Sequence, residues 1–176
     1  MFQTLALVIL AALALLLIYA ATRPDSFRVE RSARIQASPE RVYALINDLQ
    51  QLKRWNPWER KDPGLKGTFG GTTAGVGAAY GWESAKVGTG RMEITQVQPG
   101  RKVAMKLDFI KPFQAQNRAE FALHSAGGAT EVRWSMEGPT PFLSKLIGVF
   151  VSMDRMIGRD FEDGLGHLKQ IAEQGA

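Results

Sequence analysis

The sequence contains no cysteine among its 176 residues and only two histidines. The lack of cysteine excludes disulfide bonds, thiol catalysis and cysteine-ligated zinc. His124 lies beside a glycine turn, and His167 has no second metal ligand four residues away on its predicted helix, so we expect no metal site. No serine stands in a GxSxG elbow. The residues therefore indicate no catalytic group and no cofactor.

Charged side chains are absent from the first 22 residues. The uncharged run from Leu5 to Ala21, together with the three residues before it, reaches the roughly 20 residues that span a bilayer. We predict a transmembrane helix over residues 1–22 and a linker over 23–26. A cleaved signal peptide is the alternative, but it needs a basic start and a small residue at the cleavage site. No Lys or Arg precedes the run, and Ala20-Ala21-Thr22 ends on a poor residue for cleavage.

The positive charges nearest the predicted membrane helix all follow it, at Arg23, Arg28, Arg31 and Arg34. Loops rich in Lys and Arg stay in the cytoplasm, so we predict a single-pass membrane protein with a cytoplasmic soluble domain. The formal net charge is +5, but positive and negative residues are interleaved and form no dense basic cluster. We therefore expect no nucleic acid partner. Nothing in the sequence indicates the oligomeric state.

The soluble part begins with strand-like alternation at 27–36, followed by a helix start at Ser38-Pro39-Glu40. Asn47-Asp48 divides this region into two short helices that end near Trp55, and turns are predicted at 55–58 and 61–64. Apolar and polar residues then alternate over segments that predict six further strands: 65–70, 78–84, 91–98, 103–109, 119–123 and 132–136. The pattern predicts an α+β domain with an antiparallel meander that has one wet face.

Twelve residues from Gly70 to Gly81 are rich in glycine. A dinucleotide-binding turn needs GxGxxG leading into a helix, whereas here the spacing is GxGxxxG and a strand follows. We interpret this stretch as a flexible hairpin.

The last element predicted is one long helix over 140–172, capped by Thr140 and started by Pro141. Apolar residues recur there at steps of three and four and share one face: Leu146, Phe150, Met153, Ile157, Phe161, Leu165 and Leu168. Four glycines, Gly148, Gly158, Gly164 and Gly166, weaken such a helix. Either they pack closely against a strand, or they let the helix bend or lift to admit a ligand.

Three segments of the sequence carry a family resemblance: FRVERSARIQASPERVYALINDLQQLKRWNPW, GRMEITQVQPGRKVAMKLDF and FVSMDRMIGRDFEDGLGHLKQI. In these, the chain resembles the START-like or Bet v 1-like superfamily, and within it the SRPBCC branch of polyketide cyclase/dehydrase and lipid-transport proteins that carry an N-terminal membrane anchor. The resemblance implies a helix-grip domain over 27–176, in which a curved antiparallel sheet wraps around a long C-terminal helix. It also implies a hydrophobic cavity between that helix and the sheet.

Large apolar side chains on the predicted inner faces are the candidate lining of this cavity: Trp58, Tyr80, Trp82, Met92, Phe109, Phe121, Trp134, Met136, Phe150, Met153 and Ile157. Asp154 and Arg155 interrupt the apolar helix and are candidate polar anchors, although an ion pair on the wet side of the helix explains them as well.

The function expected from these residues is binding or transfer of a hydrophobic small molecule, such as a lipid, a quinone or a polyketide-like compound, taken from the adjacent bilayer. One alternative is a cyclase or dehydrase acting on a hydrophobic substrate, and another is a protein-interaction module with a closed core. Fold alone does not decide between them, because one fold hosts many functions.

Overall fold

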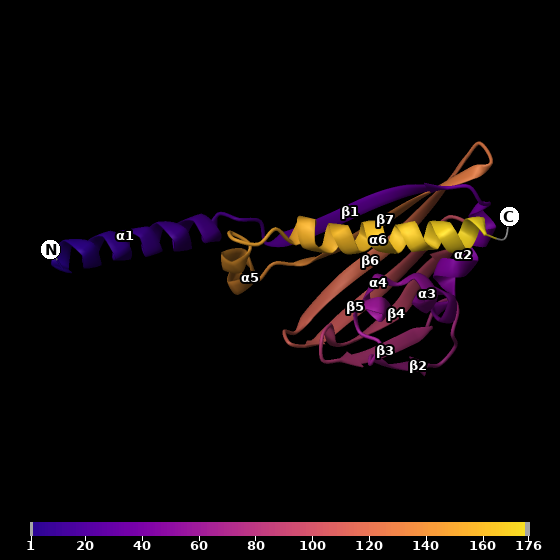
Figure 1. Cartoon of the computed structure of the whole chain (residues 1–176), viewed down its shortest axis with the longest axis horizontal. Coiled ribbons are helices and arrows are strands. Elements are labelled where there is room, and N and C mark those ends of the chain that lie inside the picture. The colour runs from indigo at the N-terminus through magenta and orange to yellow at the C-terminus, as the bar shows by residue number, and fades with distance from the viewer. Residues whose placement is uncertain (1, 175–176) are drawn as a thin grey trace.

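The computed structural model describes residues 2–174; residue 1 of the predicted membrane segment and residues 175–176 of the predicted domain lie outside this range. Helix α1 (Phe2–Ala21) projects from an α+β domain, as Figure 1 shows. The other elements, in chain order, are β1 (Ser26–Ile35), α2 (Pro39–Asn47), α3 (Leu49–Trp55), α4 (Pro57–Lys61), β2 (Lys66–Gly70), β3 (Ala79–Ser84), β4 (Gly88–Gln98), β5 (Lys102–Lys111), β6 (Ala115–Ala126), β7 (Ala129–Pro139), α5 (Phe142–Ile147) and α6 (Met153–Glu173).

The seven strands form one antiparallel sheet in the order β1-β7-β6-β5-β4-β3-β2. Strands β2 to β7 follow one another as a meander, and β1 closes the other edge by pairing with β7, with Val29 opposite Met136. Helix α6 packs along β1 and against the short helices, over one face of the sheet (Figure 1). The predicted α+β helix-grip architecture is confirmed.

The segment between β1 and β2 contains three short helices, where the sequence predicted two and a turn. Asp48 ends α2, and its Oδ1 accepts a hydrogen bond from the N–H of Gln50 (2.8 Å), which starts α3. Asn56 caps α4 in the same way, because its Oδ1 accepts a hydrogen bond from the N–H of Trp58 (3.2 Å), and Pro57 occupies the first helical position. The predicted turn at 55–58 was therefore wrong, since Asn-Pro here caps a helix.

The prediction of one continuous helix over 140–172 was also wrong. Helix α5 begins at Phe142 without a side-chain cap, so Thr140 does not cap it, and it ends at Gly148, whose N–H bonds to the carbonyl of Ser144 (2.8 Å). After a break at 148–152, the hydroxyl of Ser152 accepts from the N–H of Arg155 (3.2 Å) and starts α6. The break takes Phe150 off the apolar face that the periodicity had predicted.

An aromatic cluster fills the space between the middle of α6 and the sheet. The rings of Trp134 on β7 and Phe161 on α6 are stacked, with centroids 4.0 Å apart and planes at 7°. Trp55 packs edge-on against both Trp134 (5.7 Å) and Phe121 (5.8 Å). These four side chains are 5% exposed or less, so they fill most of the space under α6.

Two glycines of α6 test the packing explanation directly. A Cβ on Gly164 would lie 2.8 Å from Cζ3 of Trp134 and 3.0 Å from Cδ of Pro57, whereas a Cβ on Gly166 would meet open space. We expect Gly166→Ala to raise the free energy of unfolding by about 1 kcal/mol through helix propensity alone. Gly164→Ala should instead lower it by about 1–3 kcal/mol, because overpacking exceeds that gain.

Thermal and urea unfolding of the two alanine variants, followed by circular dichroism, checks this pair. Equal stabilisation by both substitutions would show that the contact at Gly164 is loose and would favour the hypothesis that α6 bends.

Candidate ligand cavity

An apolar cavity of about 90 Å³ lies beside α4 and not beneath α6. Its walls are contributed by the segment from α3 to β2, by strands β3, β4, β5 and β7, and by the turn before β4. The lining residues are Asn56, Trp58, Glu59, Leu65, Tyr80, Trp82, Val87, Met92, Leu107, Phe109 and Met136. The cavity lies here because the aromatic cluster of Trp55, Phe121, Trp134 and Phe161 occupies the space under α6.

A second void, of about 40 Å³, lies deeper in the core, between this cavity and the aromatic cluster. Five residues line both spaces: Asn56, Trp58, Met92, Leu107 and Met136. Methionine is unbranched and adapts its shape at low cost, so Met92 and Met136 are the parts of this partition that move most easily.

The structure divides the predicted lining residues into three groups. Trp58, Tyr80, Trp82, Met92, Phe109 and Met136 surround the larger cavity, and Phe121 and Trp134 line the deeper void. Ile157 is buried but lines neither space, whereas Phe150 and Met153 lie on an open surface beside α5.

Five cavity residues were not predicted: Asn56, Glu59, Leu65, Val87 and Leu107. Leu107 carried a usable signal, because it stands in period-two alternation between Met105 and Phe109. Glu59 carried none, because a charged residue in a segment predicted as a turn gives no reason to place it against a cavity. Its position depends on α4, which turns its side chain toward β3.

The polar end of the cavity is built by Tyr80 and Glu59. The hydroxyl of Tyr80 donates to Oε1 of Glu59 at 2.5 Å, and Nζ of Lys53 lies 3.6 Å from Oε2 of the same carboxylate. Gly67 on β2 makes room for this hydroxyl, since a Cβ there would lie 2.0 Å from it. Burial and the hydrogen bond to Glu59 raise the pKa of Tyr80 well above its ordinary value of 10.0. Tyr80 is therefore a proton-bearing donor throughout the physiological range.

Removal of this hydroxyl should lower the free energy of unfolding by an amount that depends on pH. We expect Tyr80→Phe to lower the free energy of unfolding by about 1–3 kcal/mol near neutral pH, because Glu59 loses its donor at a largely buried site. The pKa of Tyr80 is raised in the folded state. The contribution of its hydroxyl to the free energy of unfolding is therefore complete below the unfolded-state pKa of about 10, and it is lost as the pH rises through the folded-state pKa.

Urea unfolding of both proteins at neutral pH and above pH 10 tests this sign. The difference in free energy of unfolding between wild type and Tyr80→Phe should become smaller above pH 10. A difference that becomes larger there would contradict a raised pKa for Tyr80.

The rim of the cavity is formed where Trp82 lies over β4. A Cβ on Gly90 would be 2.4 Å from Cζ2 of Trp82, so the indole occupies the space that a side chain on Gly90 would need. The ring of Phe109 meets Trp82 edge-on at 5.9 Å. Both aromatic residues and Val87 are only half-buried. This rim is therefore partly open to solvent.

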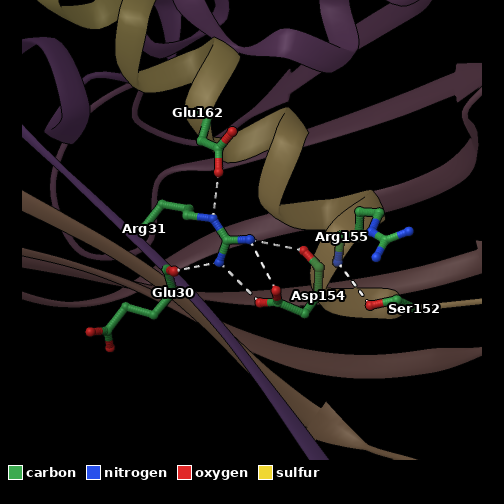
Figure 2. Close-up of polar contacts among 6 residues, drawn as sticks. All are labelled: Glu30, Arg31, Ser152, Asp154, Arg155 and Glu162. Carbon is green, nitrogen blue, oxygen red and sulfur yellow. Dashed lines mark hydrogen bonds and ion pairs between the residues drawn. The ribbon is translucent and has the colours of Figure 1, made fainter.

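The predicted polar anchors lie elsewhere, as Figure 2 shows. Nη1 of Arg31 donates to Oδ1 of Asp154 (3.0 Å), Nη2 donates to Oδ2 (3.1 Å), and Nε donates to Oε1 of Glu162 (2.7 Å). The hydrogen bond from Arg31 holds the pKa of Asp154 below its ordinary value. The guanidinium of Arg155 points away from this cluster (Figure 2). Neither Asp154 nor Arg155 lines the cavity; Asp154 instead joins the start of α6 to β1.

The fold and this cavity can be compared with known proteins. A family model described as polyketide cyclase / dehydrase and lipid transport matches residues 26–173. The search of curated proteins returns no match.

Solved structures show the same fold at low sequence identity. A crystallised protein of Chromobacterium violaceum is 16% identical with a TM-score of 0.60, over 86% of this chain and 99% of that one. The Aha1 dimer of Colwellia psychrerythraea is 19% identical with a TM-score of 0.58, over 84% and 96% of the two chains. DynU16, from the dynemicin biosynthetic locus, is 15% identical with a TM-score of 0.60, over 87% of this chain and 49% of that one.

The structural neighbours carry the fold alone, because their identities are low. The family model matches the segment that runs from β1 to the end of α6, which also contains every residue that lines the cavity. The resemblance to the SRPBCC branch is thereby confirmed, and the chain belongs to the polyketide cyclase / dehydrase and lipid transport family.

Proposed function

We propose that this protein binds a hydrophobic small molecule that carries one polar group, at the surface of the membrane that α1 enters. The observation that carries the proposal is the cavity itself, which is apolar except at the end built by Asn56, Glu59 and Tyr80. Small-molecule sites have this character, with an apolar lining and a few polar groups that fix the orientation of the ligand. The apolar part of the ligand contacts Trp82, Met92 and Phe109, and its polar group meets the Tyr80–Glu59 pair.

The size of the cavity limits how the ligand is held. A volume of about 90 Å³ is below the roughly 300–1,000 Å³ of pockets that enclose drug-sized molecules. A larger ligand therefore needs the cavity to expand, and rearrangement of Met92 and Met136 would join it to the deeper void as the first step.

Access from the membrane is supported by the direction of the strands. The half-buried rim lies at the end of β3, at the end of β5 and just before β4. The register places these positions at the same end of the strands as Ser26 at the start of β1. Helix α1 joins the domain at that end of the sheet (Figure 1). An anchor there raises the local concentration of a membrane-soluble ligand at the rim.

Co-purification of a ligand tests the proposal. The full chain is purified in mild detergent, and its organic extract is compared by mass spectrometry with that of two tryptophan variants. Val87→Trp fills the rim of the cavity, whereas Val76→Trp adds the same side chain at a 61% exposed position that does not line the cavity. We expect a hydrophobic molecule with wild type and Val76→Trp, and roughly tenfold less with Val87→Trp, the effect of about 1.4 kcal/mol of lost affinity.

Two results would count against binding at this site: no bound molecule in any of the three proteins, or equal amounts in all of them. The first would favour the alternative of a closed interaction module. The circular dichroism spectra and melting temperatures of the variants show that each one is folded.

An enzymatic role is the second candidate, and Glu59 is the observation that favours it. Its side chain is 11% exposed, lines the cavity and is the carboxylate among the lining residues. A carboxylate in such a position can act as a general base toward a bound substrate. Glu59→Gln keeps the shape of the side chain, so it should retain the ligand and abolish any conversion of it. Conversion at an unchanged rate in Glu59→Gln would reject this role for Glu59.

A further inference from the structure

Helix α5 has its charged residue inside and its apolar residues outside. Lys145 is 8% exposed, whereas Phe142, Leu143 and Ile147 on the same helix are each about half exposed. The segment that follows continues this surface, and Phe150 is 75% exposed. We call the whole set the α5 surface: Phe142, Leu143, Ile147, Phe150, Val151, Met153 and Met156. An exposed apolar patch of this kind marks a surface that meets a partner or a membrane.

Lys145 forms an ion pair with the linker, where the side chain of its partner Asp25 is 97% exposed. Its Nζ lies 2.5 Å from Oδ1 of Asp25, and the carbonyl of Asp25 accepts a hydrogen bond from the N–H of Thr140 (2.7 Å). The bond from Lys145 also holds the pKa of Asp25 below its ordinary value. The Lys145–Asp25 ion pair therefore ties α5 to the linker, and the apolar side chains of the helix face solvent.

The α5 surface is continuous with the end of α1. Ala20 of α1 is fully buried where the two helices meet, and Figure 1 shows α5 beside the end of α1 that joins the domain. At this end Nη1 of Arg23 donates to the hydroxyl of Tyr19 (3.3 Å), and the guanidinium lies 5.9 Å from the centre of the tyrosine ring. Tyrosine and arginine at the end of an apolar helix mark the level of the lipid headgroups. The α5 surface thus lies at the depth where a membrane interface would be.

We propose that the α5 surface inserts its apolar side chains into the boundary between headgroups and acyl chains of the bilayer that α1 enters. The occupant is lipid, and not a second copy of the chain, because the surface continues from a helix whose own apolar side chains face outward along its length. Apolar side chains on an interfacial helix enter this boundary by about 5–10 Å. The proposal rests on the proposed membrane anchor.

Two attachments restrict the domain more than one flexible anchor does. With α1 spanning and the α5 surface inserted, the domain cannot swing freely about residues 22–25, and the end of the sheet that carries Trp82 and Phe109 stays turned toward the bilayer. The α5 surface would therefore set the direction in which the cavity rim faces.

The lack of native cysteine makes a clean experiment possible. Three full-length single-cysteine variants, Leu10→Cys, Phe150→Cys and Ser125→Cys, carry an environment-sensitive fluorophore and are reconstituted into phosphatidylcholine–phosphatidylglycerol vesicles. The fluorophore reports on α1, on the α5 surface and, at exposed Ser125, on the β6–β7 hairpin at the far end of the sheet. We expect lipids that carry a quencher near the headgroup to quench Phe150→Cys roughly fivefold more than Ser125→Cys, because only an inserted probe reaches that depth.

The outcomes separate this proposal from the anchor beneath it. Quenching of Leu10→Cys by a quencher deep in the bilayer, with Phe150→Cys no more quenched than Ser125→Cys, would overturn insertion of α5 and leave the anchor in place. An unquenched Leu10→Cys would overturn the anchor and this proposal together. A probe at Phe150→Cys that is shielded from water and from lipid, with cross-linking that rises with protein density, would assign the surface to a second copy and overturn insertion.

Discussion

Phe161→Ala is expected to lower the free energy of unfolding by about 3–5 kcal/mol, the usual cost of truncating a buried aromatic residue. Phe161 is fully buried, its ring stacks on Trp134 at 4.0 Å, and it meets Trp58 edge-on at 6.3 Å. Truncation leaves a cavity next to the deeper void and removes the stacking contact between α6 and Trp134 on β7. Urea unfolding of the full chain in a mild non-ionic detergent, followed by near-ultraviolet circular dichroism, measures the loss.

Phe150→Ala is the matched control, because it removes the same side chain from a position that is 75% exposed. We expect it to change the free energy of unfolding by less than about 0.5 kcal/mol. Equal effects at the two positions would mean that the aromatic cluster is not the core that holds α6 in place.

Ala12→Arg should remove the protein from the membrane fraction. An arginine at the centre of a membrane-spanning helix costs about 2.5–3.5 kcal/mol, and residue 12 lies in the middle of the 20 residues of α1. The corresponding fall in the ratio of inserted to non-inserted protein is roughly 70- to 400-fold, since each 1.4 kcal/mol is a factor of ten. Membranes from expressing cells, washed with alkaline carbonate and analysed by immunoblot, give this ratio.

Thr22→Arg introduces the same side chain beside Arg23, at the polar end of α1, where it should leave the protein in the washed membranes. Intact mass of the wild-type protein shows at the same time whether the segment is retained or cleaved as a signal peptide. An Ala12→Arg protein that still resists the carbonate wash would contradict a spanning α1.

The position of the cavity is set by the aromatic residues that lie under α6. In this chain the space under α6 is filled by Trp55, Phe121, Trp134 and Phe161, so the open volume lies beside α4. The size of these aromatic residues decides where a ligand can go. A relative with smaller side chains at the positions of Trp134 and Phe161 would have room beneath the long helix instead.

The elements that the sequence predicted well are those whose signal is local. Strand alternation in 103–109 and 132–136, the cap at Ser38 and the uncharged run at 5–21 each depend on neighbouring residues, and the structure has a strand, a helix start and a helix there. The meander follows from the same pattern, because short turns join strands that are antiparallel neighbours.

The cavity lining was predicted only in part, because periodicity shows which residues face inward but not which of them touch one another. Trp134 and Tyr80 have the same inward signal, yet Trp134 is stacked in the core and Tyr80 reaches a carboxylate. Glu59 was not predicted at all, since its place depends on a short helix that turns its side chain toward Tyr80 on β3.

The sequence by itself determined the α+β architecture, the family and an apolar N-terminal helix long enough to cross a bilayer, because periodicity, capping and the length of an uncharged run are properties of consecutive residues. Tertiary structure alone decided that Asp154 pairs with Arg31 and that Lys145 pairs with Asp25. Each of these depends on residues more than 100 positions apart, and local pattern carries no information on such pairs.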